Sequence, residues 1–183
     1  RLGADSVARR RRNVRRASRT GRKRAVGDIG GPPGRRLEVV GDALSRAERE
    51  VRLAEVLLAG GFPEETCRPI REALGWATGG LLALHGGEPG AGEPARAPSA
   101  TLPPARLVQA VLVDPGHVPA DLAARLSRVR ELTVETGEGV DVPPLSAGAA
   151  GETVAAVRDL VTLGRERAAA DAIGMGREGA AAR

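Results

Sequence analysis

The fold is decided by residues 37–84, LEVVGDALSRAEREVRLAEVLLAGGFPEETCRPIREALGWATGGLLAL. Apolar residues recur in each half of this stretch at alternating steps of three and four, which places them on one face of a helix. Between the halves, Gly60-Gly61 ends the first helix and Pro63 opens the second, where its missing N–H costs no hydrogen bond. The pattern predicts an antiparallel helical hairpin. Its two stripes are Leu37, Val40, Leu44, Ala47, Val51, Ala54 and Leu58, and Cys67, Ile70, Leu74, Ala77, Leu81 and Leu84.

The second helix of the hairpin contains residues that weaken a helix. Pro69 costs about 3 kcal/mol inside a helix, and Gly75, Gly79 and Gly80 cost about 1 kcal/mol each relative to alanine. This helix therefore depends on packing against the first. The small residues also allow a further helix to approach closely.

The rest of the chain predicts shorter helices and linkers. Helices are expected at about 106–113, from Pro119 to near Gly137, and from an N-cap at Ser146 to about Ala170. With 1% aromatic residues, the core must consist of Leu, Val, Ile and Ala. We therefore predict an all-α fold, a small antiparallel helical bundle over residues 37–170 with a flexible Gly/Pro-rich linker at 86–104. The tail at 171–183 is expected to be disordered.

Positive charge is concentrated at the start of the chain. Residues 1–36 hold 13 Lys and Arg against 2 Asp, a net charge of +11, whereas residues 37–183 hold 15 against 21 Asp and Glu, a net charge of −6. Residues 1–36 also contain few apolar side chains. Burial of so little apolar surface cannot offset the conformational entropy lost on ordering, which predicts a disordered arm over 1–36. The arm's candidate nucleic-acid-binding residues are Arg9, Arg10, Arg11, Arg12, Arg15, Arg16, Arg22, Lys23 and Arg24.

Such a density of cationic groups binds phosphate backbones of RNA or DNA without sequence preference and with a strong dependence on salt. No aromatic residue is interleaved with the arginines, so stacking on bases is not available. The alternative is a solvated linker that binds nothing.

No catalytic or metal-ligating constellation is evident. His85 and His117 are the only histidines, and both are expected to be exposed in glycine-bordered turns, although a general base or ligand is the alternative. Cys67 lies on the inward stripe and is expected to be an inert core thiol. Zinc sites need several closely spaced Cys or His, which this sequence lacks, so we predict no metal. The glycines of residues 27–31 follow no predicted strand and therefore do not form a phosphate-binding loop, so we predict no cofactor.

No apolar run approaches the length of about 20 residues that a membrane span needs. A single cysteine indicates a reducing compartment, and we expect a cytoplasmic protein without membrane contact. Because the chain starts at Arg1 and not at Met, we also expect it to be a piece of a longer protein.

Three segments carry a resemblance to a known family: residues 53–62 (LAEVLLAGGF), 70–86 (IREALGWATGGLLALHG) and 118–130 (VPADLAARLSRVR). Together with the expected helix over 146–161, they resemble the HEPN family over about residues 37–165. The resemblance implies a bundle that self-associates, as a homodimer or with a partner helix, and that accompanies a nucleic-acid enzyme.

Many HEPN proteins are ribonucleases that use an arginine followed several residues later by a histidine. Arg130 matches that arginine, but residues 131–137 (ELTVETG) contain no histidine. We therefore expect a non-catalytic interaction module. The alternatives are the similar C-terminal helical segment of Swi/Snf-type helicases of high-GC bacteria, a metal-independent endoribonuclease or toxin–antitoxin component, and a plain oligomerisation unit.

Overall fold

The computed structural model describes residues 33–85, 97–134 and 145–181, and these residues form an all-α fold without strands. The elements are α2 (Pro33–Ala59), the 3₁₀ turn η1 (Pro63–Thr66), α3 (Cys67–His85), α4 (Ala105–Val108), the π-helix η2 (Gln109–Val113), α5 (Ala120–Val134) and α6 (Ala147–Ala181).

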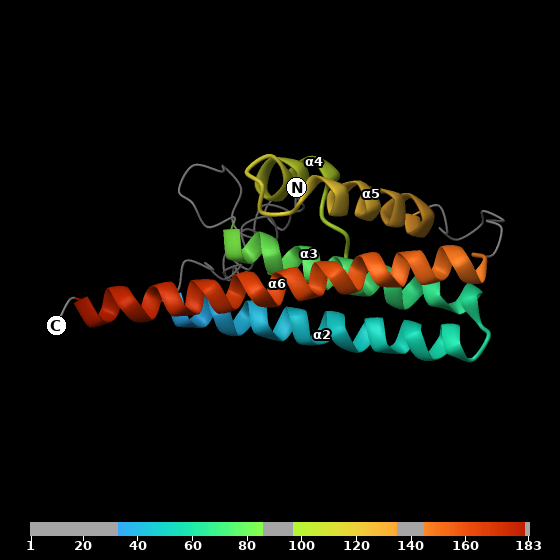
Figure 1. Ribbon diagram of the computed structural model, residues 1–183, viewed down its shortest axis with the longest axis horizontal. Helices are drawn as coiled ribbons and strands as arrows, with labels where there is room; N and C mark the ends of the chain where they lie inside the picture. Colours follow the sequence, from blue (N-terminus) through green and yellow to red (C-terminus); the bar gives the residue numbers. More distant parts are fainter. Residues whose placement is uncertain (1–32, 86–96, 135–144, 182–183) are drawn as a thin grey trace, which may run out of the picture.

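Three long helices form the body of the molecule. α2 runs antiparallel to both α3 and α6, and the three pack on one another along their lengths (Figure 1). α4, η2 and α5 form a second layer, in which η2 lies on α3 and α5 lies on α3 and α6. The antiparallel helical bundle predicted from the sequence is confirmed.

The two predicted stripes of the hairpin form much of the core. Their central residues are buried, and only Leu37, Leu58 and Cys67, at the ends of the stripes, are half-buried. Val154, Val157 and Val161 of α6 complete this core from the third side. Leu122 and Val129 add the inward face of α5, as the sequence predicts.

The hairpin turn is a Schellman motif. The N–H of Phe62 donates to the carbonyl of Leu57 at 2.9 Å, and the N–H of Gly61 donates to that of Leu58 at 3.1 Å. Gly61 adopts a φ of +83°, which L-residues rarely tolerate. The predicted glycine turn is therefore confirmed.

The start of the second helix differs from the prediction in one detail. The residues after Pro63 form a 3₁₀ turn, and α3 proper begins at Cys67. Pro69 is thus the third residue of α3, where its missing N–H would have no partner within the helix. The expected cost of a proline in the helix interior does not arise.

Two expected boundaries are corrected. α2 begins at Pro33 and not at Leu37, so the last residues of the expected arm are helical; residues 1–32 lie outside the described residues. α6 continues past Ala170 to Ala181 and extends beyond the start of α2 (Figure 1), because its alanines favour helix strongly enough to tolerate the interspersed glycines. Ser146 caps α6 as predicted, accepting a hydrogen bond from the Ala149 N–H at 3.2 Å.

Part of the expected flexible linker is packed against the bundle. Residues 97–104, here called the strap, lie against α3 at two of its glycines. A Cβ at Gly75 would lie 2.3 Å from the carbonyl oxygen of Ala100, and one at Gly79 would lie 3.1 Å from Cα of Pro98. The glycines of α3 therefore seat a segment of their own chain, not a partner helix. Residues 86–96 of the expected linker lie outside the described residues.

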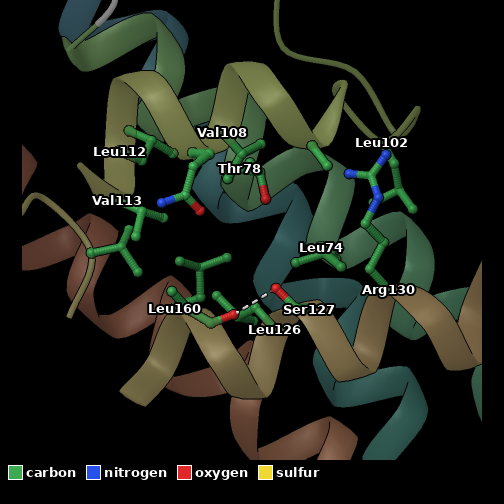
Figure 2. Close-up of a pocket in the computed structure, with 14 residues that line it drawn as sticks. Leu74, Thr78, Leu102, Val108, Leu112, Val113, Leu126, Ser127, Arg130 and Leu160 are labelled. Atoms are coloured by element: carbon green, nitrogen blue, oxygen red, sulfur yellow. Dashed lines mark hydrogen bonds between the residues drawn. The ribbon is translucent and has the colours of Figure 1, made fainter. Parts of the chain in front are cut away.

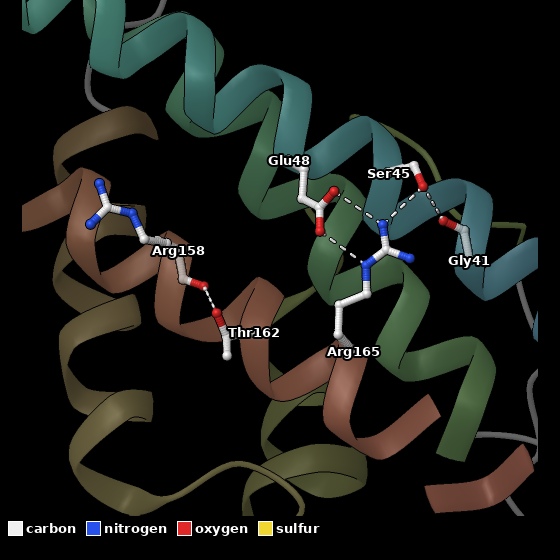
Figure 3. Close-up of polar contacts among 6 residues, drawn as sticks. All are labelled: Gly41, Ser45, Glu48, Arg158, Thr162 and Arg165. Atoms are coloured by element: carbon white, nitrogen blue, oxygen red, sulfur yellow. Dashed lines mark hydrogen bonds and ion pairs between the residues drawn. The ribbon is translucent and has the colours of Figure 1, made fainter. Parts of the chain in front are cut away.

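Two ion pairs join α2 to α6. Arg165 donates to both carboxylate oxygens of Glu48, at 3.0 and 3.1 Å, and to the hydroxyl of Ser45 at 3.0 Å (Figure 3). Seven residues away on each helix, Arg158 pairs with Glu55. These side chains are partly exposed, so each pair stabilises the fold by only about 0.2–1 kcal/mol.

The contact between the strap and α3 generates a test. Gly75→Ala forces a methyl group into the backbone of Ala100 and should lower the free energy of unfolding by about 1–3 kcal/mol in urea titrations. The matched control is Gly41→Ala in α2, where a Cβ meets nothing within 4 Å. That variant should gain up to about 1 kcal/mol from helix propensity. Equal stability of the two variants would contradict the close contact.

Candidate functional site

The predicted arm residues lie outside the described part of the chain. Arg9, Arg10, Arg11, Arg12, Arg15, Arg16, Arg22, Lys23 and Arg24 all precede Pro33, where α2 begins. Their attachment point is therefore the first turn of a long helix whose next residues include Arg35 and Arg36. Their role in binding phosphates stays a prediction.

Arg130, the arginine that resembles the HEPN motif, is held by the backbone of the strap. It lies on α5, and its Nη1 donates to the carbonyl oxygen of Pro103 at 2.6 Å. No sequence signal marks Pro103 as its partner, because 27 residues separate the two. This hydrogen bond gives Arg130 a structural function, since it fastens α5 to the segment that crosses α3.

The two histidines are not the exposed loop residues that the sequence predicted. His85 is the last residue of α3, His117 lies in the turn before α5, and both are half-buried. Their rings stack with centroids 3.8 Å apart and an angle of 6° between the ring planes. The prediction failed because the turn after η2 returns to the end of α3, a contact between distant parts of the chain.

The environment of His85 favours its neutral form. The pKa of His85 is lowered from the usual 6.5 to about 4, mainly by burial; His117 and Arg167 also lower it, and Asp171 opposes the shift. Its Nε2 is buried and has no hydrogen-bond partner among the described residues. A protonated ring here would lose hydration and meet neighbouring positive charge, so His85 is neutral at pH 7.

The geometry of this pair does not suit a shared metal. A metal bound by imidazole lies in the ring plane, and the lone pairs of two parallel stacked rings point along parallel planes and do not converge on one ion. Within the described residues, no three His, Cys, Asp or Glu side chains gather in a way that could hold a metal.

Cys67 occupies the first turn of α3 and is half-buried. Burial raises the pKa of its thiol, and the nearby Arg71 only partly opposes this. Because the thiolate is the nucleophilic form, the raised pKa favours an unreactive thiol, in agreement with the structural role expected from the stripe.

The tip of the hairpin exposes apolar side chains. Leu53, Val56 and Phe62 are 48%, 68% and 53% exposed, and we call them the tip patch. Leu53 and Val56 are one helical turn apart on α2. The Phe62 ring lies 3.2 Å from the position of a Cβ at Gly60, one turn beyond Val56, so the three form a continuous surface. Contiguous exposed apolar surface is typical of interaction sites, so the tip patch is a candidate for one.

Comparison of the chain with protein-family models, with curated proteins and with solved structures finds no match. The resemblance to HEPN proteins and to the helicase segment therefore stays a hypothesis. None of the described helices combines the length and the apolar character that crossing a membrane requires.

The stacked histidines predict a pH dependence of stability. Since the folded-state pKa of His85 lies below its usual value, the unfolded chain binds more protons between pH 6.5 and 4. Stability should be complete above about pH 6.5 and fall by about 1–2 kcal/mol as the pH drops to 4, allowing for solvent screening at a half-exposed ring.

Urea titrations of the wild-type chain and of His85→Phe at pH 4.5 and 7 check this prediction. The phenyl ring preserves stacking on His117 but does not titrate, so the variant should lose less stability at low pH than the wild type. If both proteins lost the same free energy of unfolding between pH 7 and 4.5, the pH dependence would arise from groups other than His85.

Proposed function

We propose that this chain is a non-catalytic, HEPN-like helical interaction module that acts beside or within a nucleic-acid machine. In this proposal the bundle is the docking body, and the basic arm contributes non-specific contacts to phosphates. The possibility that the chain is the C-terminal appendage of an ATP-dependent helicase is one form of the same proposal.

The observation that carries the proposal is the separation of charge along the chain. A net charge of +11 lies in residues 1–36, whereas the remainder is acidic overall. Because the negative phosphates of a nucleic acid repel the net negative charge of residues 37–183, attraction to phosphates is confined to the arm. The bundle therefore remains available for other partners.

The environment of Arg130 supports a non-catalytic module over a ribonuclease. Its guanidinium is engaged with the carbonyl of Pro103, and the only histidines are stacked on each other in the turn that precedes α5 and at the end of α3. A ribonuclease of the HEPN kind would need a histidine beside that arginine. Incubation of the wild-type chain with mixed RNA should therefore give no cleavage. Cleavage that disappears in the Arg130→Ala variant would instead support a ribonuclease.

The arm can be tested in the full chain. Replacement of its nine named Arg and Lys residues by glutamine should weaken RNA binding at least about tenfold at low salt. The slope of log affinity against log salt should fall by up to about 6, because each phosphate contact on single strands contributes about 0.7. Filter binding across a salt series measures both quantities.

The control keeps the charge and changes the chemistry. A variant in which the eight arginines of the set become lysine should retain most of the affinity and the slope, since counterion release depends on charge. An unchanged slope in the glutamine variant would refute the nucleic-acid part of the proposal and leave the helical module.

A plain oligomerisation unit is a second candidate, and the tip patch favours it. The three glycines of α3 cannot seat a partner helix, because Gly75 and Gly79 are covered by the strap and Gly80 faces Ala43 of α2. Self-association would instead use the exposed apolar surface of Leu53, Val56 and Phe62.

Val56→Glu tests this candidate by sedimentation at micromolar concentrations. The substitution should convert a dimer to a monomer without loss of folding stability, because Val56 is 68% exposed. Ile173→Glu, at a comparably exposed apolar residue on α6, is the matched control and should leave the dimer intact. A wild-type chain that sediments as a monomer removes the candidate.

A further inference from the structure

A cavity lies between the two layers of the fold. Its volume is about 110 Å³, and it is bounded by α3, the α4–η2 segment and α5, with Leu160 of α6 at its base (Figure 2). Leu74, Leu112, Leu126 and Leu160 give it a mainly apolar lining. An apolar cavity of about 150 Å³ in another protein accommodates benzene, so this smaller space, which is partly open to solvent, admits part of a short aliphatic chain.

A polar group without a partner faces this space. Thr78 of α3 lines the cavity, its side chain is only 5% exposed, and no described residue hydrogen-bonds its hydroxyl. The three other buried threonines bond to backbone carbonyls of their own helix or turn, as Thr66 does to Pro63 at 2.6 Å. Because this hydroxyl keeps access to the cavity and has no hydrogen-bond partner among the described residues, it is free to bond to an atom of a ligand bound there.

A positive charge stands at one end of the same cavity. Arg130 lines it from α5, and its one hydrogen bond, from Nη1 to Pro103, leaves the other donors of the guanidinium available. Among the described residues no carboxylate lies within ion-pair distance of it, in contrast to Arg125, which pairs with Asp159 at 2.7 Å. Within the described part of the chain, Arg130 therefore has no opposite charge at ion-pair distance that would compete with an anionic ligand.

The wall opposite α5 has an unusual backbone. Residues 109–113 form a π-helix, closed by a hydrogen bond from the N–H of Asp114 to the carbonyl of Gln109 at 2.9 Å. π-Helical turns are rare and occur frequently at functional sites. Here the π-helix carries Leu112 and Val113 into the lining of the cavity.

From these observations together we propose that the cavity binds a short aliphatic carboxylate that carries a second oxygen along its chain. The carboxylate pairs with the guanidinium of Arg130, the chain lies among the leucines, and the second oxygen hydrogen-bonds to the hydroxyl of Thr78. A bound ligand would join the strap, α3 and α5 through the same arginine that already fastens them.

The test uses three probes of equal chain length with the full protein, followed by amide NMR shifts: 6-hydroxyhexanoate, hexanoate and hexan-1-ol. We expect saturable shifts around Leu74, Thr78 and Leu112 with 6-hydroxyhexanoate, at a Kd on the order of 1 mM. Hexanoate should bind several-fold more weakly and hexan-1-ol about tenfold more weakly. Equal binding of hexan-1-ol and the acids would reveal an apolar crevice only and overturn the proposal, as would the absence of saturable binding.

Variants separate the two polar contacts. Arg130→Met should weaken both acids about tenfold and leave hexan-1-ol unchanged, whereas Arg128→Met, an exposed arginine outside the lining, should alter none of the three. Thr78→Val should remove the advantage of 6-hydroxyhexanoate over hexanoate.

Ala123→Leu, which fills the cavity from α5, should abolish binding of every probe while the urea transition confirms folding. Binding of the acids that survives both Arg130→Met and Ala123→Leu would place them elsewhere and refute the site.

Discussion

The close approach of the strap to Gly75 and Gly79 is the constraint on which the rest of this structure depends. At Gly75 the strap comes too near α3 for a Cβ to fit without a shift of the backbone, and at Gly79 the space for a Cβ is tight. The strap is thereby fixed across the bundle, and α4, η2 and α5 follow it into place over α3 and α6. The hydrogen bond from Arg130 to Pro103 holds the second layer from the other side. The stacked histidines and the cavity both lie between α3 and the second layer that these contacts hold.

Local features of the fold could be predicted from the sequence because they depend on neighbours along the chain. The apolar spacing of Val40, Leu44 and Ala47 identifies a buried face without knowledge of what covers it. The turn at Gly61 requires a positive φ, which a glycine in the sequence indicates. Ser146 is recognised in the same way, as an N-cap residue directly before a helix. The turn and the cap depend on hydrogen bonds within about one helical turn, and the buried face follows from spacing along a single helix.

The features that could not be predicted join distant residues. His85 and His117 are 32 positions apart, and nothing in either glycine-bordered segment indicates that the rings meet. The same holds for Arg130 and Pro103, and for Thr78, whose significance lies in the cavity that it faces. The glycines of α3 were identified as places of close approach, but the sequence pattern could not distinguish the chain's own strap from a partner helix. The ends of α2 and α6 were also misplaced, since these helices continue past their apolar stripes into exposed residues, where helix propensity and not burial extends them.

Charge and apolar surface are distributed over different parts of the protein. Cationic density belongs to the region before α2, exposed apolar side chains gather at the opposite end of the hairpin, and the half-buried polar groups lie under the second layer. The charge, the exposed apolar surface and the polar groups of the cavity therefore belong to different segments of the chain.

The two ion pairs between α2 and α6 define the alignment of these helices, although they add little to stability. Glu48 and Glu55 are seven residues apart, as are Arg158 and Arg165, so both pairs form in one antiparallel register. Sliding α6 by one turn would leave both carboxylates unmatched, and sliding it by two turns would preserve at most one pair. The core between the helices consists largely of alanines, valines and leucines, whose contacts carry little directional information, so these weak surface contacts favour the observed offset over its neighbours.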